Sequence, residues 1–385
     1  MEAAIKTILI LNPYFYPGYK AGGPVQSLLH LVEHLGQRYR FAVFTSAHDL
    51  GETSVYPSVQ TNQWQTLTVN GKQVMVWYAS GRITRKVLLQ CIQSLQPNAV
   101  YINGMYGMPW FIWPLQWWKK KKIKVERIIV CPRGMLQPGA LAVKPWRKKI
   151  YFKGLGLLAL CKGVVWHATT PDEANDIRRF AKENARVVVA ANIPKWPLQE
   201  WLPSNKRAGG LQLIYLSLIT EKKNLLLLLQ ALRLCQQSIT LHIYGPIVDT
   251  RYWQECEKQM QQMPAHIQVA YKGSVPPTAV QSTIAQYDAL VLLTKGENFG
   301  HAIYESLSAA RPVLISTFTP WQHLQEKQAG WDIPIESVHQ IAQTIDELAL
   351  METSEWITFC SGAHSLALQV VEQNNWEYDY GLLFD

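Results

Sequence analysis

The chain has 385 residues, of which 48% are hydrophobic and 17% are charged. That length is more than a single hydrophobic core usually serves, so the composition predicts a folded protein of two domains and excludes a disordered chain. Residues 1–195 hold 26 Lys and Arg against 9 Asp and Glu, whereas residues 196–385 hold 11 against 19. Net charges of +17 and −8 indicate that the two halves meet different partners.

The distribution of cysteines and apolar residues disfavours several classes of protein. The start of the chain has neither the basic residues nor the long apolar core of a secretory signal, and no run of about 18 apolar residues could span a membrane. We therefore expect a cytoplasmic protein. Neither a disulfide framework nor a zinc site is expected, because no C-x-x-C pair occurs among Cys91, Cys131, Cys161, Cys235, Cys256 and Cys360.

In the first half, short apolar runs alternate with helical or loop segments, which predicts a mostly parallel sheet. A loop rich in turn residues follows the first run, ends in Gly22-Gly23-Pro24 and leads into a helix at 25–35. Strands are expected at 7–11, 41–45, 74–78, 99–103, 127–131, 164–168 and 187–190.

Prolines and glycines between residues 192 and 210 predict the linker between the domains. The alternation then restarts, with helices expected at 224–234, 252–263 and 278–285, and further helix from 337 onward. Strands are expected at 211–216, 239–244, 267–271, 289–293 and 313–316. The second half is therefore another doubly wound α/β domain.

The strongest motif follows the apolar strand at 289–293. It is a glycine-bracketed turn that opens a helix, and the free N–H groups at such a helix start attract anions such as phosphate. Glu297 lies in the turn and Glu305 lies eight residues later, so the two carboxylates could meet two ends of one extended ligand. A solvated helix charge is the alternative, but ligand sites in open α/β sheets use this order of strand, turn and helix.

These residues resemble the signature of glycosyltransferase family 4, whose members are retaining enzymes of the GT-B fold. The matching segments are Glu297-x7-Glu305 with Asn298-Phe299-Gly300 between them, 310–316, Gly22-Gly23-Pro24, 132–136, 167–173 and Thr319-Pro320-Trp321. The resemblance implies two Rossmann-like doubly wound domains facing across a cleft. Residues 1–195 would bind the acceptor, 196–365 would bind the nucleotide sugar, and 366–385 would include a helix that crosses back to the first domain.

The resemblance also implies a donor site. Lys223 would bind the diphosphate, with Lys222 as the next choice, Glu305 would accept hydrogen bonds from the ribose hydroxyls, and Glu297 would contact the transferred sugar. The full donor set would be Gly22, Gly23, Lys222, Lys223, Glu297, Asn298, Phe299, Gly300, His301 and Glu305.

One expected cation is missing from the chain. The family usually has an arginine five residues before the lysine, where this sequence has Leu218, and Arg133 or Lys295 could replace it. Arg133 would also stand where some members place a histidine, so we expect it in the catalytic set with Glu297 and Lys223. The acceptor side would consist of Tyr14, Tyr16, Tyr19, Lys20 and Arg133.

Two further polar residues are expected to be structural. His167 is predicted in or near the core, and Asp249 is predicted to cap the helix that follows it.

The implied function is a retaining, metal-independent and cofactor-free transfer of a sugar from a nucleotide-diphosphate sugar. The acceptor would be a lipid-linked or polysaccharide intermediate of bacterial surface polysaccharides such as lipopolysaccharide. Two alternatives remain open, a GT-B-fold nucleotide-sugar epimerase and a non-catalytic nucleotide- or carbohydrate-binding protein.

Two stretches of the first half, 117–124 and 144–149, combine tryptophan with clustered lysine, and Trp110 and Trp113 lie near the first of them. Tryptophan rings at headgroup level with cations at the phosphates are typical of contact with an anionic bilayer. An ordinary solvated surface is the alternative. A nucleic-acid partner is not expected, because no helix-turn-helix, RNA-recognition or zinc-finger pattern is present. The sequence therefore predicts peripheral contact with the inner face of the cell membrane.

Overall fold

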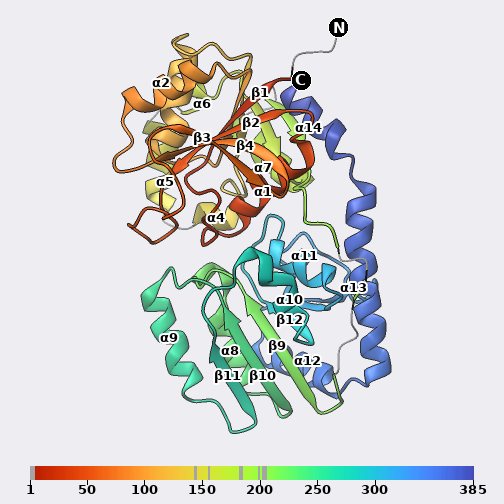
Figure 1. The fold of residues 1–385 in the computed structure, drawn as a ribbon. Coiled ribbons are helices and arrows are strands. Elements are labelled where there is room, and N and C mark those ends of the chain that lie inside the picture. The colour runs from red at the N-terminus through yellow and green to blue at the C-terminus, as the bar shows by residue number, and fades with distance from the viewer. Residues whose placement is uncertain (1–4, 143–144, 155–156, 182–184, 198–199, 202–205) are drawn as a thin grey trace. The chain divides into compact units, whose positions relative to one another are not determined.

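The protein is described here by a computed structural model, which covers residues 5–142, 145–154, 157–181, 185–197, 200–201 and 206–385 (Figure 1). The chain divides into two compact units, the first formed by Met1–Ile193 with Asn375–Asp385 and the second by Pro194–Asn374. The sequence placed these boundaries after residues 195 and 365.

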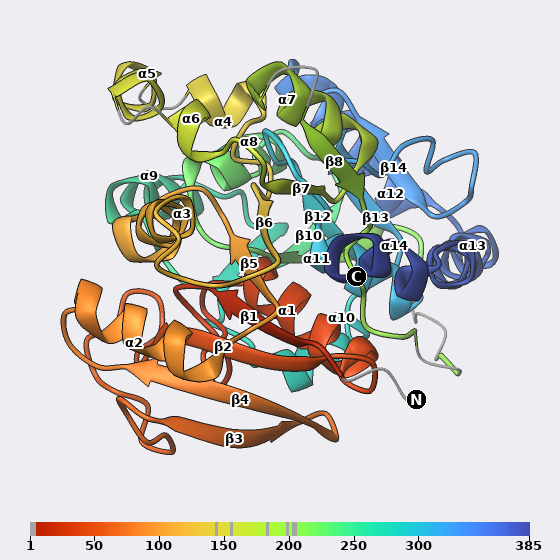
Figure 2. The same cartoon turned by 90° about the horizontal axis from the view of Figure 1, so that it is seen from above.

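The first unit contains an eight-stranded sheet in the order β3-β4-β2-β1-β5-β6-β7-β8 (Figure 2). All seven strands expected from the sequence are confirmed, while β3 was not anticipated because half of its residues are polar and only Val69 is buried. Only the β3–β4 pair is antiparallel. The strands are β1 (Thr7–Leu11), β2 (Arg40–Ser46), β3 (Trp64–Val69), β4 (Lys72–Ala79), β5 (Ala99–Asn103), β6 (Arg127–Cys131), β7 (Val165–Ala168) and β8 (Arg186–Val189).

The chain order of the strands reverses between β1 and β5, which are neighbours in the sheet. Because such connections are right-handed, a reversal puts helices on both faces and opens a ligand-binding crevice at the carboxyl ends of the two strands. The helices are α1 (Gly23–Leu35), α2 (Arg85–Leu95), a π-helix (Met108–Ile112), α3 (Trp113–Lys119), α4 (Pro138–Ala142), α5 (Pro145–Gly154), α6 (Leu157–Leu160) and α7 (Pro171–Ala181).

The second unit has a six-stranded, wholly parallel sheet in the order β11-β10-β9-β12-β13-β14. Here the order reverses between β9 and β12. The five expected strands are confirmed, and β14 is an additional edge strand. The strands are β9 (Gly210–Leu216), β10 (Ser238–Tyr244), β11 (Ile267–Tyr271), β12 (Ala289–Leu292), β13 (Val313–Ser316) and β14 (Gly330–Ile333).

Apolar side chains from the strands and helices of the second unit form one continuous core. The helices are α8 (Leu225–Leu232), α9 (Thr250–Met260), α10 (Val280–Ile284), α11 (His301–Ser308), α12 (Val338–Leu350) and α13 (Thr353–Gln373), with short 3-10 turns at Glu221–Lys223 and Pro277–Ala279. The helix expected from residue 337 onward is thus three helices, the last being α14 (Trp376–Phe384).

Helix α14 belongs to the first unit. Phe384 is fully buried, and its ring centroid lies 5.2 Å from that of Tyr39 and 6.0 Å from that of Tyr101. Lys6 Nζ donates to the carbonyl of Phe384 at 3.3 Å, and an Arg127 nitrogen donates to that of Leu383 at 3.2 Å. Cations at a helix C-terminus satisfy the free carbonyls and complement the macrodipole, so the end of the chain is fixed by packing and by charge.

Replacing Phe384 tests the contribution of this packing to stability. We expect Phe384→Ala to lower the free energy of unfolding by about 3–5 kcal/mol, because it leaves a cavity among aromatic rings. Leu382→Ala is the matched control, since Leu382 lies on the same helix and is 42% exposed. Urea unfolding measures both variants, and equal small losses would contradict an anchoring role for Phe384.

Candidate active site

The loops that follow β9 and β12 are joined to each other at the reversal of the second sheet. The amide of Lys295 donates to the carbonyl of Lys222 at 2.8 Å, and the Thr294 hydroxyl donates to the same carbonyl at 3.2 Å. Asn224, in a left-handed conformation, donates from Nδ2 to the carbonyl of Leu293 at 3.0 Å. These bonds hold the two loops, and the predicted donor residues on them, in one fixed arrangement.

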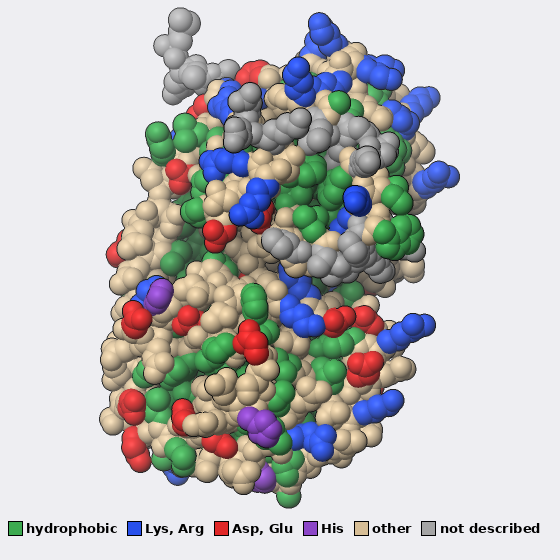
Figure 3. Space-filling view, turned by 180° about the vertical axis from the view of Figure 1, so that it is seen from behind, with side chains coloured by type: hydrophobic (Ala, Val, Ile, Leu, Met, Phe, Trp, Pro, Cys, Tyr) green, Lys and Arg blue, Asp and Glu red, His purple; other side chains and the backbone are tan. Residues whose placement is uncertain are grey.

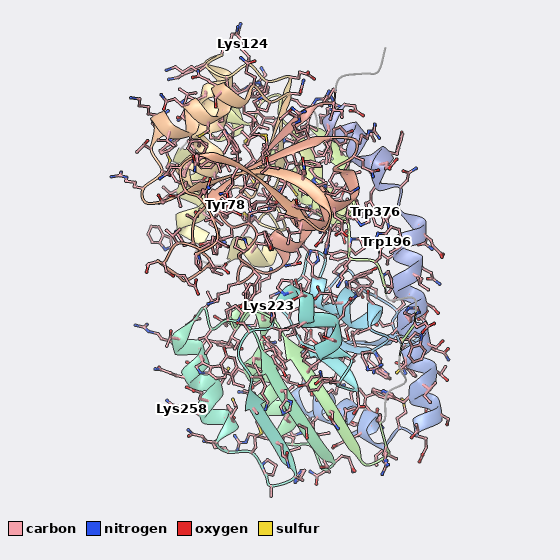
Figure 4. The ribbon with its side chains drawn as sticks, in the orientation of Figure 1. Tyr78, Lys124, Trp196, Lys223, Lys258 and Trp376 are labelled. Carbon is pink, nitrogen blue, oxygen red and sulfur yellow. The ribbon has the colours of Figure 1, made fainter. Side chains whose placement is uncertain are left out.

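Two ion pairs cross between the same loops. Lys223 Nζ donates to Glu297 Oε1, and the two side chains are only 18% and 11% exposed. Lys295 pairs with Glu221 at 3.0 Å, but those side chains are 49% and 78% exposed. Since solvent screens exposed charges, the Lys223–Glu297 pair is the stronger electrostatic feature. Figure 4 shows Lys223 at the carboxyl edge of the second sheet.

The turn that carries Glu297 is also fixed from the β13 side. The Glu297 amide donates to the carbonyl of Phe318 at 3.0 Å. Trp321 Nε1 donates to the carbonyl of Phe299 at 2.5 Å, which assigns a role to the Thr319-Pro320-Trp321 segment. The turn is therefore held in place by backbone contacts on both sides.

Helix α11 begins directly after this turn. Gly300 has φ 79°, a left-handed conformation that disfavours other residues, and it offers no side chain to cap the helix. The first N–H groups of α11 have no partner within the helix, so they are suited to a bound anion. Helix α9 differs, because Asp249 accepts hydrogen bonds from the amides of Arg251 and Tyr252 at 3.1 Å, which confirms its predicted capping role.

Glu305 is half-buried on α11, and no hydrogen bond or ion pair engages its carboxylate within the described part of the chain. Burial raises the pKa of Glu305 to about 7, against the opposing effect of Lys195. The side chain therefore titrates near neutral pH and has acceptors available for a ligand.

In the first unit, the loop after β1 is organised by a buried carboxylate. Asp49, which is 3% exposed, accepts hydrogen bonds from the amides of Tyr19 at 2.9 Å and Lys20 at 3.1 Å. Lys20 Nζ also pairs with Glu52 Oε1 at 2.5 Å. Asp49 was not identified from the sequence, although a polar His48-Asp49 pair one residue after a buried strand was the available signal.

The remaining predicted residues of that loop lie around it. Tyr14 packs edge-on against His48 with centroids 6.4 Å apart, and burial raises the pKa of Tyr14. Tyr16 is 43% exposed. Gly22 has φ 70° and precedes α1 without a side-chain cap. Its carbonyl accepts from the amides of Val25 at 3.0 Å and Gln26 at 3.4 Å, and Pro24 has no N–H, so this helix start is less suited to an anion than that of α11.

Arg133 follows β6 in a left-handed conformation, and its guanidinium is engaged by protein acceptors. It donates to Asn103 Oδ1 at 2.6 Å, to Tyr101 Oη at 3.1 Å and to Asn192 Oδ1. Asn103 in turn donates to Asn12 Oδ1 at 3.0 Å, which joins the ends of β5 and β1. The expected contact of Arg133 with a phosphate or an acceptor stays a prediction, and such a ligand would compete with these acceptors.

His167 is fully buried at the end of this network, as the sequence predicted. Its Nε2 lies 2.8 Å from the carbonyl of Ala190, which can only accept, so Nε2 carries the proton. Nδ1 then accepts from the Tyr101 hydroxyl at 2.8 Å. Burial and the charge of Arg133 lower the pKa of His167 to about 3, and the side chain is a neutral structural residue at physiological pH.

A second buried carboxylate holds the Arg133 loop. Glu173 is 1% exposed and accepts from the amides of Gly134 at 2.6 Å and Thr169 at 2.8 Å. The sequence singled out this glutamate only as part of a matching segment. The structure shows that it joins the loops after β6 and β7.

The structure therefore gathers the predicted residues at two sheet edges. The carboxyl edge of the second sheet carries Lys222, Lys223 and the segment from Glu297 to Glu305. The carboxyl edge of the first sheet carries Arg133 and the loop after β1, which contains Tyr14, Tyr16 and Tyr19. A cavity of about 690 Å³ lies at the opposite edge of the second sheet, where Gly210 and Asp288 line it, and is separate from these residues. The joint site across a cleft stays a prediction.

Comparisons with known proteins agree with this geometry. Residues 200–355, which lie in the second unit, match the model of the family described as Glycosyl transferases group 1. No curated protein matches the chain in sequence.

Solved structures resemble nearly the whole chain. Sucrose-phosphate synthase from Thermosynechococcus elongatus superposes with a TM-score of 0.73 at 14% identity, covering 98% of each chain. HepE of Anabaena, in complex with UDP and glucose, gives 0.69 at 14% identity over 94% of this chain and 95% of its own. WaaG, a glycosyltransferase involved in lipopolysaccharide biosynthesis, gives 0.64 at 13% identity over 94% and 95%. The chain thus has the GT-B fold, with two parallel-sheet α/β units, of which the second matches the glycosyl transferases of group 1.

Proposed function

We propose that this protein is a retaining glycosyltransferase that uses a nucleotide-diphosphate sugar. The observation that carries the proposal is the grouping of Lys223, Glu297 and Glu305 around an uncapped helix start, at the strand reversal of the unit that matches the group 1 family. Ligands of open α/β sheets bind at such a reversal.

Each member of this group has a distinct task in the proposed reaction. The diphosphate gains negative charge as the glycosidic bond breaks, and Lys223 with the first N–H groups of α11 would stabilise that charge. These groups supply the positive potential without a metal ion or another cofactor. Glu305 would accept hydrogen bonds from the ribose diol, and Glu297 would contact the transferred sugar.

Similar structures suggest the first substrates to examine. HepE holds UDP and glucose, and WaaG acts in lipopolysaccharide biosynthesis, so we propose a UDP-sugar as donor and a lipid-linked or polysaccharide hydroxyl as acceptor. The acceptor would bind on the first unit, near the loop with Tyr14, Tyr19 and Lys20. The proposed donor and acceptor follow from the resemblance to family 4 and from these similar structures.

Donor binding tests the proposal directly. A UDP-sugar at about 100 times its Kd should stabilise the protein by about 2.7 kcal/mol in a thermal-shift screen. Lys223→Ala should weaken binding by at least about tenfold, because charge-assisted hydrogen bonds contribute about 1.5–3 kcal/mol. Glu305→Ala should have a similar effect. Lys258→Ala is the control, since Lys258 is an exposed lysine of α9 (Figure 4).

The reaction itself separates the proposal from its alternatives. NMR of the product formed with an acceptor panel should show the anomeric configuration of the donor. Conversion of a UDP-sugar without any acceptor would instead identify an epimerase. Donor binding with no turnover across the panel would favour a binding protein, and absence of all nucleotide-sugar binding would contradict the proposal.

Glu305 predicts a pH dependence of donor binding. Its pKa of about 7 means that the carboxylate is ionised above neutral pH and protonated below it. The protonated form offers fewer acceptors to a ribose diol, so the affinity for UDP-glucose should fall by about tenfold between pH 8 and pH 6. Calorimetry measures the profile, which Glu305→Gln should flatten. A wild-type profile as flat as that of the variant would contradict the ribose role.

We also propose that the protein contacts an anionic membrane through its first unit. None of the helices that the structure describes is long and apolar enough to span a bilayer. Trp146 and Ile150, four residues apart on α5, are each 61% exposed. Lys149 beside them is exposed, as are the lysines at 119–122 and Lys124 after α3, and α6 contacts both α3 and α5. Figure 3 shows exposed apolar and basic side chains on this unit.

The prediction that the tryptophans at 110–118 make this contact is corrected in part. Trp117 is only 3% exposed, and Trp110, Trp113 and Trp118 pack against the apolar core of the first unit. Among these tryptophans only Trp117, on α3, is buried, and the other three are half-buried, whereas the lysines at 119–122 reach solvent. Of the second predicted stretch, Lys144 lies outside the described residues.

Vesicle co-sedimentation tests the membrane contact. Replacing both Trp146 and Ile150 by Ser should reduce binding to phosphatidylserine-containing vesicles at least about fivefold, because exposed apolar side chains supply the insertion energy. The matched control is the double replacement of Trp196 and Leu350 by Ser, which are 51% and 53% exposed in the second unit. Equal loss in both double variants, or equal binding to neutral vesicles, would contradict this surface.

A further inference from the structure

We infer that Glu297 makes the site discriminate between a nucleotide sugar and the bare nucleoside diphosphate that remains after transfer. The inference rests on the proposed function, and it adds a role for this residue beyond contact with the sugar. Its basis is the ion pair of Glu297 with Lys223, the lysine proposed to bind the diphosphate.

The ion pair is built into the loops. Lys223 and Glu297 follow neighbouring strands, and the loops that carry them are joined by the Lys295–Lys222 and Asn224–Leu293 hydrogen bonds. The Glu297 amide is bound as well, to the carbonyl of Phe318. Since backbone contacts hold both residues, a diphosphate that reaches Lys223 also lies close to the Glu297 carboxylate.

Competition for the ammonium has a cost that depends on the ligand. If the phosphate takes Lys223 from Glu297, a carboxylate that is only 11% exposed loses its partner. If the ammonium uses its three donors to hold both, two anions are brought together and repel each other. In either arrangement the ligand must offset the cost of leaving the Glu297 carboxylate without its partner or beside another anion.

A nucleotide sugar supplies that compensation and its product does not. The hydroxyl groups of the sugar are neutral donors, and they can satisfy the carboxylate as Lys223 turns to the phosphates. A bare nucleoside diphosphate has no sugar beyond its terminal phosphate to offer such donors to Glu297, and that phosphate carries additional negative charge. Glu297 therefore favours the donor over the product and promotes release of the product after transfer.

The neighbouring ion pair provides a matched control. Glu221 pairs with Lys295 in the same two loops and would lose the same charge on replacement by Gln, but its side chain is 78% exposed. Solvent already screens it, so its charge should not distinguish between the two ligands.

Calorimetry at pH 8 with UDP and UDP-glucose tests the inference. Glu297→Gln should tighten UDP at least tenfold and leave UDP-glucose unchanged or weaker, so that the ratio of the two Kd values changes at least tenfold. Glu297→Ala should shift the ratio in the same direction, and Glu221→Gln should change it less than twofold. Unaltered unfolding temperatures establish that the variants are folded.

Three results would overturn the inference. These are weaker UDP binding by both Glu297 variants, an equal change for both ligands, or the same shift in Glu221→Gln. Failure of the wild-type protein to bind either ligand is distinguishable, because it would overturn the proposed function and this inference with it.

Discussion

The candidate site depends on one constraint, the fixed spacing between the loops that follow two neighbouring parallel strands. β9 and β12 are adjacent in the sheet although many residues separate them in the chain. Their loops are held together by the bonds of Lys295 and Asn224 to the opposite backbone. A cation from one loop and a carboxylate from the other thus keep their relative position whichever ligand approaches, which is the preorganisation that electrostatic catalysis requires.

In the first unit, buried carboxylates hold the loops at the carboxyl edge of the sheet in place. Asp49 binds two amides of the loop after β1, and Glu173 joins the loops after β6 and β7. Both carboxylates are nearly inaccessible to solvent, so removal of either would leave buried amides without partners. Loops at the carboxyl edges would otherwise be mobile, and these anchors make them suitable for positioning ligands.

Much of this could be predicted from the sequence, because strands buried on both faces are continuous apolar runs and glycine-bracketed turns are local. Strand β3 was missed because its exposed face is polar, and Trp117 was assigned to a surface because the inward face of α3 depends on tertiary packing. The partners of Arg133 could not be predicted either, since Asn103 and Asn192 are distant in the chain. Strands and local turns were therefore predictable from the sequence, while hydrogen-bond partners that lie far apart in the chain were not.

The charge balance at the donor edge has a consequence for turnover. A site that stabilises a diphosphate leaving group strongly also retains the product, unless something opposes that affinity. Here Leu218 stands where the resemblance implies an arginine, and Glu297 pairs with Lys223. Under the proposed function, the uncharged N–H groups of α11 would supply further attraction for the diphosphate. They would stabilise charge that develops in the transition state without holding the departed nucleotide as firmly as two cations would.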